Sequence, residues 1–146
     1  MTDRVAVEAT AWGGSGPAET PTAYADSLDG LIQRMVDEGH FVGAVLATAD
    51  GLPIASASSR EDAEVTSAMV AMLSRVSEEA KRQLGMAEVD EVTIRDRERS
   101  RLVCRSLSVA GEELLLAVRV PARRSHRRAT NQAIRRIQRA WLDWQP

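Results

Sequence analysis

A largely apolar segment, residues 43–57, predicts a β-hairpin. Neither face of residues 43–49 carries a charge, which is typical of a strand covered on both sides in mid-sheet. Asp50-Gly51 is a strong signal for a two-residue turn, in which both positions need positive φ. Pro53 cannot donate a hydrogen bond to a sheet, so the second strand should lie at an edge or begin there. We therefore predict a hairpin with helices on both faces.

Helical periodicity precedes the hairpin and returns after it. The first set of apolar residues recurs every three or four positions and predicts an amphipathic helix that ends at Gly39. This set comprises Tyr24, Leu28, Leu31, Ile32, Met35 and Val36. A second helix should begin after Ser59, whose hydroxyl can cap free backbone N–H groups, and end at Gly85.

The second helix carries two uncharged faces. One is a broad apolar stripe that we expect to pack on the protein's own sheet; it contains Val65, Ala68, Met69, Met72, Leu73, Val76, Ala80 and Leu84. The opposite face of its first half is small and neutral, and contains Ala63, Ser67, Val70, Ala71 and Ser74. A solvated helix back normally carries charge, so this small face is either a second contact surface or a plain exposed face rich in alanine and serine.

Three further strands and a last helix complete the pattern. Val92 and Ile94 alternate with Glu91, Thr93 and Arg95, which predicts a strand with one solvent-exposed face. Residues 102–107 form the next strand, and residues 114–118 are apolar on both faces, which predicts a second central strand. A basic helix should run from near His126 to Trp144, with an apolar face of Ile134, Ile137, Trp141 and Trp144. This order predicts an α/β sandwich of mostly antiparallel strands.

The composition fits one globular domain preceded by an arm. The 146 residues contain 3% aromatics, so the core must be aliphatic and rich in alanine. Residues 1–22 are predicted to form a flexible arm, because Gly13-Gly14-Ser15-Gly16-Pro17 has linker composition, and residues 23–146 the domain. We expect no signal peptide and no membrane insertion, since no apolar run could span a bilayer. Cys104 is the single cysteine, which favours a reducing compartment, the cytoplasm.

The small net charge of −2 hides a strong asymmetry along the chain. After Glu113 the sequence carries eight arginines and one acid, whereas before that point it carries eleven basic and twenty acidic residues. Such polarity often marks a surface that faces a partner. Arginine also greatly outnumbers lysine, and alanine is abundant, which hints at a GC-rich bacterial genome.

No set of residues in the sequence forms a recognisable catalytic or ligand-binding motif. The glycine-rich arm lacks the Lys-Ser/Thr of a phosphate-binding loop. His40 and His126 have no acid at metal-ligand spacing, so a solvated or capping role explains them better. Cys104 lies between apolar neighbours and should be a small core residue. We therefore expect neither a metal nor a cofactor, and no active site of its own.

The element order and three segments resemble the Roadblock / dynein light chain family, and most of all its bacterial, MglB-like branch. The segments are GAVLATADGLPIAS, the helix EDAEVTSAMVAMLSRVSEEAKRQLG, and the strand series EVTIR, RLVCRSL and ELLLAVRV. The resemblance covers residues 28–141. It implies a five-stranded sheet between one helix and two helices, homodimerisation, and a small Ras-like GTPase as partner.

The resemblance and the helix pattern together suggest two surfaces. The predicted dimer interface combines the small helix face with the strand that follows, through Ala63, Ser67, Val70, Ser74, Val92 and Ile94. The predicted partner-binding residues are the exposed charges Arg75, Glu78, Glu79 and Arg82, with Arg135, Arg136 and Arg139 of the last helix as a second candidate. The resemblance therefore predicts a dimeric scaffold or regulator, including an activator, of a small Ras-like GTPase. The alternative is a nucleic-acid-binding module that uses the arginines of residues 123–139.

Overall fold

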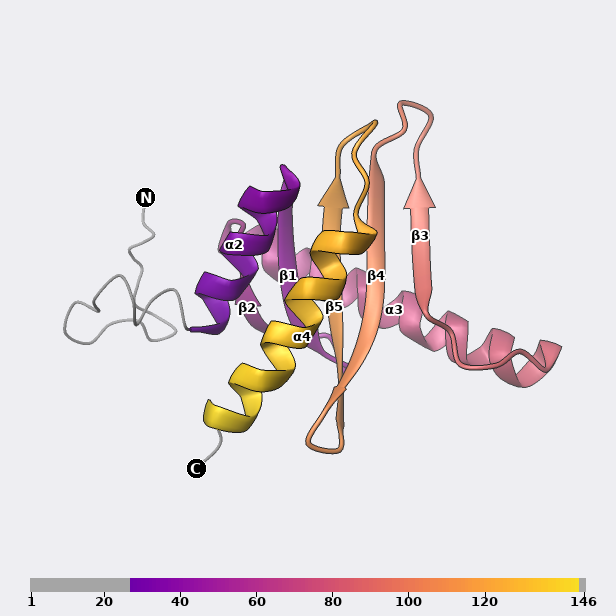
Figure 1. Cartoon of the computed structure of the whole chain (residues 1–146). Coiled ribbons are helices and arrows are strands. Elements are labelled where there is room, and N and C mark those ends of the chain that lie inside the picture. The colour runs from indigo at the N-terminus through magenta and orange to yellow at the C-terminus, as the bar shows by residue number, and fades with distance from the viewer. Residues whose placement is uncertain (1–26, 145–146) are drawn as a thin grey trace.

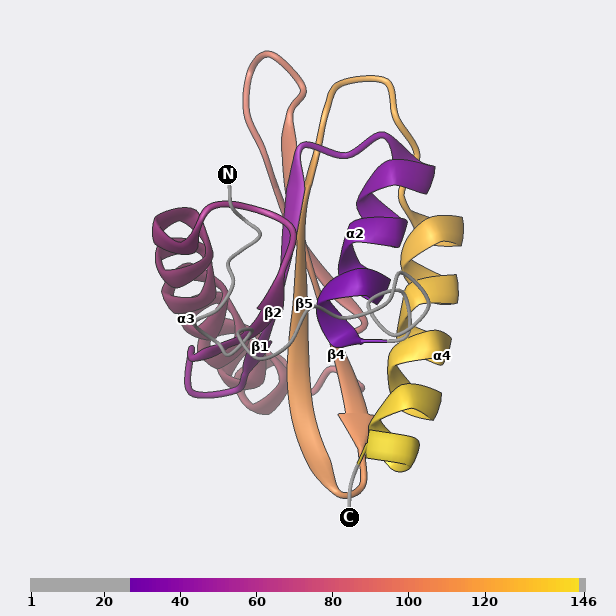
Figure 2. The same cartoon turned by 90° about the vertical axis from the view of Figure 1, so that its left-hand side faces the viewer.

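A single antiparallel sheet of five strands forms the centre of the protein, as a computed structural model of residues 27–144 describes it (Figure 1). The strand order is β2-β1-β5-β4-β3. Helices α2 and α4 cover one face of the sheet and α3 covers the other (Figure 2). The predicted fold class is confirmed. The elements are α2 (Leu28–Gly39), β1 (Gly43–Thr48), β2 (Pro53–Ser56), α3 (Arg60–Leu84), β3 (Glu91–Arg95), β4 (Arg101–Val109), β5 (Glu112–Val120) and α4 (Arg127–Trp144).

The hairpin forms at the predicted place but with a different turn. As predicted, β1 lies inside the sheet between β2 and β5, and β2, which begins at Pro53, is an edge strand. The turn, however, takes four residues, 49–52, and only Gly51 has positive φ there, at 96°. The turn with two positive-φ residues lies instead between β4 and β5, at Ala110 and Gly111. The Asp-Gly pair therefore indicated the hairpin but not its turn type.

The ends of the helices follow their capping residues. Ser59 Oγ accepts a hydrogen bond from the Asp62 N–H at 3.1 Å, so the predicted start of α3 is confirmed, and Gly85 ends this helix with φ of 67°. In α2 the left-handed residue is His40, and Gly39 is the last helical residue. A Cβ atom on Gly39 would lie 2.3 Å from the Phe41 ring. Glycine is thus needed there for the close approach of that ring.

The larger core lies between the sheet and the α2–α4 layer. Its most buried large side chains come from α2, α4 and one face of the sheet, and include Ile32, Met35, Leu46, Leu116 and Ile137. Trp141 packs in the same core, so the apolar face predicted for the last helix is confirmed as far as that residue. The predictions for residues 1–22 and for Tyr24 lie outside the described residues.

The orientation that we predicted for α3 is wrong. Ala63, Ser67 and Val70 are at most 2% exposed and face the sheet, whereas the apolar stripe through Met69 and Val76 faces outward. The cause is the tight approach of this helix to the sheet and to the β1–β2 turn. A Cβ atom on Gly51 would lie 3.2 Å from Ala71 Cβ and 3.3 Å from the Ser67 carbonyl oxygen. Only small side chains fit in that space, so the small face packs inward.

Candidate interaction surface

The outward side of α3 presents a stripe of large apolar side chains, which we call the α3 stripe. It consists of Val65, Met69, Met72 and Val76. Positions i, i+4, i+7 and i+11 lie along one side of a helix. Each of these side chains is between 42% and 66% exposed. A contiguous exposed apolar patch marks an interaction site, and methionine adapts readily to a partner surface.

An open sheet edge lies next to this helix. Strand β3 pairs only with β4, and its predicted edge position is confirmed. On the face of the sheet that α3 covers, Val92 is half-buried and Ile94 is 45% exposed. The carboxyl-terminal part of α3 extends past β3 (Figure 1). Unpaired edge strands favour association with another strand, so the apolar stripe and the open edge can act together.

Charged side chains border the α3 stripe. Arg75, Glu78, Glu79 and Arg82 are all exposed, and Arg82 forms an ion pair with Glu79 one turn earlier. By helical spacing, Glu79 and Arg75 lie beside the stripe, whereas Glu78 and Arg82 lie nearer the sheet-facing side, in the last two turns of α3. The residues that we predicted to bind a partner are therefore available on the surface. Their role stays a prediction.

The residues that we predicted for the dimer interface divide into two groups. Ser74 and Val92 line the same small cleft between α3 and β3, with a cavity volume of about 20 Å³. Ile94 lies on the exposed edge strand. By contrast, Ala63, Ser67 and Val70 are buried against the protein's own sheet and cannot touch a second molecule in this fold. The four residues of the α3 stripe take their place as candidates.

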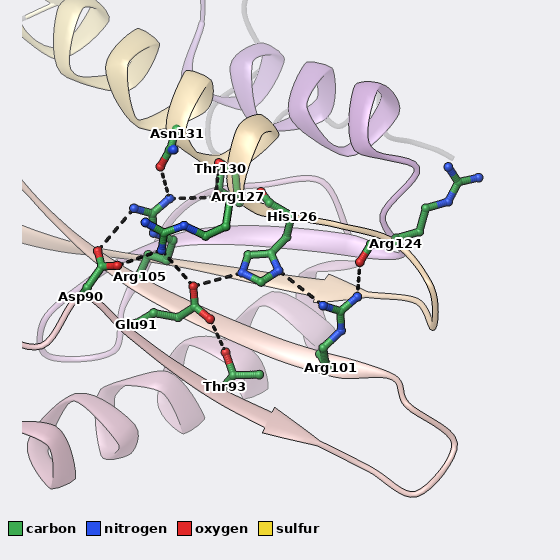
Figure 3. Close-up of polar contacts among 10 residues, drawn as sticks. All are labelled: Asp90, Glu91, Thr93, Arg101, Arg105, Arg124, His126, Arg127, Thr130 and Asn131. Atoms are coloured by element: carbon green, nitrogen blue, oxygen red, sulfur yellow. Dashed lines mark hydrogen bonds and ion pairs between the residues drawn. The ribbon is translucent and has the colours of Figure 1, made fainter.

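A polar cluster ties the start of β3 to the start of α4 (Figure 3). Arg105 in β4 is buried, and its guanidinium donates to Thr130 Oγ1 at 2.9 Å and to the side-chain oxygen of Asn131. It also forms an ion pair with Asp90 Oδ1 at 3.4 Å. Arg127 reaches the other oxygen of Asp90 at 2.8 Å. Two arginines from different elements thus hold the segment that leads into the edge strand.

Glu91, the first residue of β3, is the central acid of this cluster. Its Oε1 lies 3.0 Å from His126 Nε2 and 3.1 Å from Arg127 Nη1, while Thr93 Oγ1 donates to Oε2 at 2.7 Å. Burial alone would raise the pKa of Glu91, but these hydrogen bonds and the neighbouring positive charge lower the pKa from 4.5 to about 2. Glu91 is therefore a carboxylate at neutral pH, and it fixes the edge strand to the α4 layer.

Sequence reasoning missed this cluster. The alternation in β3 placed Glu91 on a wet face, and His126 was assigned a solvated or capping role. The two residues are 35 positions apart, so no local pattern indicates their contact. His126 Nδ1 also lies 3.5 Å from Arg101, whose guanidinium donates to the carbonyl oxygens of Pro121 and Arg124. The side chain is thus part of a hydrogen-bonded network that orders the loop before α4.

The other candidate residues have structural positions. Cys104 is buried, as predicted, and burial together with the charge of Glu113 raises the pKa of its thiol to about 11. His40 forms the left-handed end of α2. Within residues 27–144, no three histidine, cysteine or acidic side chains lie close enough to hold a metal ion. No helix of this part of the chain is long and apolar enough to cross a membrane.

The order of the strands, the one-plus-two arrangement of the helices and the open edge at β3 define a roadblock/longin-like α/β domain. The chain belongs to the Roadblock/LC7 domain family, whose family model matches residues 28–119. No curated protein sequence matches the chain.

Three of the solved structures with the same fold come from bacteria. A Roadblock/LC7 domain from Streptomyces avermitilis has a TM-score of 0.69 and 18% identity, over 78% of this chain and 97% of that one. Myxococcus xanthus MglB has a TM-score of 0.68 and 15% identity, over 80% and 95%. The gliding protein MglB of Thermus thermophilus has a TM-score of 0.67 and 16% identity, over 86% and 96%. At these identities the likeness shows the fold.

Proposed function

We propose that the protein is a homodimeric regulator of a small Ras-like GTPase. The observation that carries the proposal is the exposed α3 stripe beside an open edge strand. Exposed apolar side chains and unpaired backbone groups at a sheet edge both favour association with another molecule. Membership of the Roadblock/LC7 family and the resemblance to the MglB-like branch support the GTPase as partner. One solved structure with this fold is described as MglB with a tetrameric arrangement, so that relative assembles from several copies.

In the proposed dimer, the β3 strands of two protomers pair across a twofold axis and the α3 stripes face each other. Fully burying a valine or methionine side chain contributes about 1.5–3 kcal/mol, so covering one that is about half exposed contributes about 1 kcal/mol. Eight such side chains contribute about 8 kcal/mol, which is similar to the cost of association of 4–15 kcal/mol. The stripe alone is therefore marginal, and the strand pairing has to add to it.

Such a dimer places two α3 helices side by side, and their charged borders form one surface. Arg75, Glu78, Glu79 and Arg82 would then appear twice on a rigid platform. Charges of both signs at an interface determine specificity and association rate more than affinity. We assign the GTPase-binding role to this platform. The protein would act there as a scaffold or as an activator that positions the residues of the GTPase.

The dimer is tested by light scattering of three proteins at micromolar concentration. The wild type should have a mass of twice 15.9 kDa. Val76→Arg, at a position 66% exposed on the α3 stripe, should be monomeric. Leu52→Arg, at a position 65% exposed in the β1–β2 turn, is the matched control and should stay dimeric. A monomeric wild type, or a dimeric Val76→Arg variant, would reject the interface.

The GTPase platform is tested by a binding titration and by GTP turnover with a small Ras-like GTPase encoded beside the protein. Arg75→Glu together with Arg82→Glu should weaken binding at least tenfold, while folding and dimer mass stay unchanged because these charges are exposed. The control reverses two exposed arginines of α4, Arg128 and Arg135. A greater loss in the control would move the partner site to α4. No binding and no change of turnover with the wild type would reject the proposed function.

A further inference from the structure

The outward side of α4 carries a row of arginines, which we call the basic stripe. It consists of Arg128, Arg135 and Arg139, at positions i, i+7 and i+11, and all three are exposed. Within residues 27–144, no acidic side chain forms an ion pair with any of them. By contrast, Arg127 pairs with Asp90 and Glu91, and Arg136 pairs with Glu38. The unpaired arginines therefore lie together on one side of the helix.

The basic stripe points away from the sheet. Ala133, Ile137 and Trp141 are buried in the core on the sheet-facing side of α4, and helical spacing places the stripe on the opposite side. Arg123 and Arg124 extend the positive charge into the exposed loop before the helix. At the other end Leu142, which is 67% exposed, lies next to the stripe on the same side.

The charge of the domain is polarised between its two helical layers, even though α2, which shares the face of α4, carries one arginine and three acids. Residues 119–143, which lead into and form α4, carry eight arginines and one aspartate, a net charge of +7. Residues 60–90, which include α3, carry four basic and seven acidic residues, a net charge of −3. The two helices lie on opposite faces of the sheet (Figure 2). A negatively charged surface would therefore attract the α4 side and repel the α3 side.

We propose that the basic stripe binds the surface of an anionic lipid bilayer peripherally. Clusters of arginine on the outward face of a helix attract acidic headgroups, and an exposed leucine beside them can enter the boundary between headgroups and acyl chains. A single-stranded nucleic acid would need aromatic side chains for base stacking. Phe41 and Trp141 are both buried, so the side chains that the structure describes offer none.

The proposed dimer would double the number of arginines that face the membrane. Only this step of the inference rests on the proposed function. If the β3 edges pair in one continuous sheet, the α4 helices of both protomers lie on the same face. Six arginines would then face the membrane while the α3 platform faces away from it. Near an anionic surface each arginine strengthens binding about fivefold. Loss of the three arginines of the stripe should therefore weaken binding on the order of 100-fold per protomer.

The test is sedimentation of the full chain with vesicles. The wild type should bind vesicles that contain phosphatidylglycerol, should not bind vesicles of phosphatidylcholine alone, and should be released by high salt. The variant with Arg128→Gln, Arg135→Gln and Arg139→Gln should lose the binding. The matched control, Arg60→Gln with Arg97→Gln and Arg99→Gln, removes the same charge from exposed sites outside α4 and should bind within about twofold of the wild type.

Three outcomes would overturn the inference: no binding by the wild type, equal losses in the two triple variants, or binding of duplex DNA through the stripe without binding of vesicles. The monomeric Val76→Arg variant separates this inference from the proposed function. If dimerisation or GTPase binding is rejected but vesicle binding still depends on the stripe, only the doubling by the dimer is lost. If vesicle binding fails while GTPase binding persists, the proposed function stands alone.

Discussion

Removing the charge of Glu91 should destabilise the protein in a pH-dependent way. The change is Glu91→Gln, which keeps the shape of the side chain but weakens its bonds to His126, Arg127 and Thr93. Lowering the pKa from 4.5 to about 2 corresponds to an upper limit of about 3 kcal/mol. The side chain is still 23% exposed, so solvent screening reduces the expected loss at pH 7 to about 1–2 kcal/mol.

The sign of the pH dependence follows from the lowered pKa. A carboxyl group with a lower pKa in the folded state stabilises the fold fully above its unfolded pKa, near 4.5, and loses this contribution as the pH falls toward 2. The difference in free energy of unfolding between wild type and Glu91→Gln should therefore be greatest above pH 5. It should shrink steadily between pH 4.5 and pH 2.

The assay is urea denaturation across this pH range at one fixed protein concentration, because dimerisation would make stability depend on concentration. Glu112→Gln, at an exposed position of β5, is the matched control and should change stability by less than about 0.5 kcal/mol. An equal loss for Glu91→Gln at pH 3 and pH 7 would show that the charge of Glu91 does not stabilise the fold. A loss no greater than that of the control would refute the role of the cluster.

Two further predictions concern stability. Ser67→Ala should raise the free energy of unfolding by about 1 kcal/mol, because the fully buried Ser67 hydroxyl has no hydrogen-bond partner within residues 27–144; urea denaturation measures it, and a loss of stability would reveal a missing partner. Deletion of residues 1–22 should leave the thermal midpoint within a few degrees of that of the full chain, since the sequence predicts a flexible arm there, and a large drop would move the domain boundary.

The sequence predicted the number, order and type of the elements because these depend on local chemistry. Ser59, Pro53 and Gly85 act on their own neighbours, and the structure places each as expected. The orientation of α3 could not be predicted from the sequence. Periodicity separates the two uncharged faces of the helix but does not determine which one packs against the sheet. That choice depends on the space left by Gly51 and the β1–β2 turn, which only the folded chain reveals.

Only the part of the candidate site that follows from a local sequence pattern was predicted. The exposed charges from Arg75 to Arg82 could be recognised on the helix pattern, because no core position needs them. The contact between Glu91 and His126 could not, since it joins a strand and a helix that meet only after the sheet is complete. Long-range polar contacts leave no periodic signal in one sequence.

The tight packing of α3 separates the residues that specify the fold from those that would select a partner. Inward positions such as Ala63 and Val70 are buried and tolerate little change, whereas outward positions such as Met69, Met72 and Val76 are exposed and belong to neither core cluster. The outward side could therefore be exchanged for that of another Roadblock/LC7 domain without disturbing the sheet. If the proposed dimer forms, a set of such chimeric helices on one constant scaffold would allow its pairing to be reprogrammed into selective heterodimers.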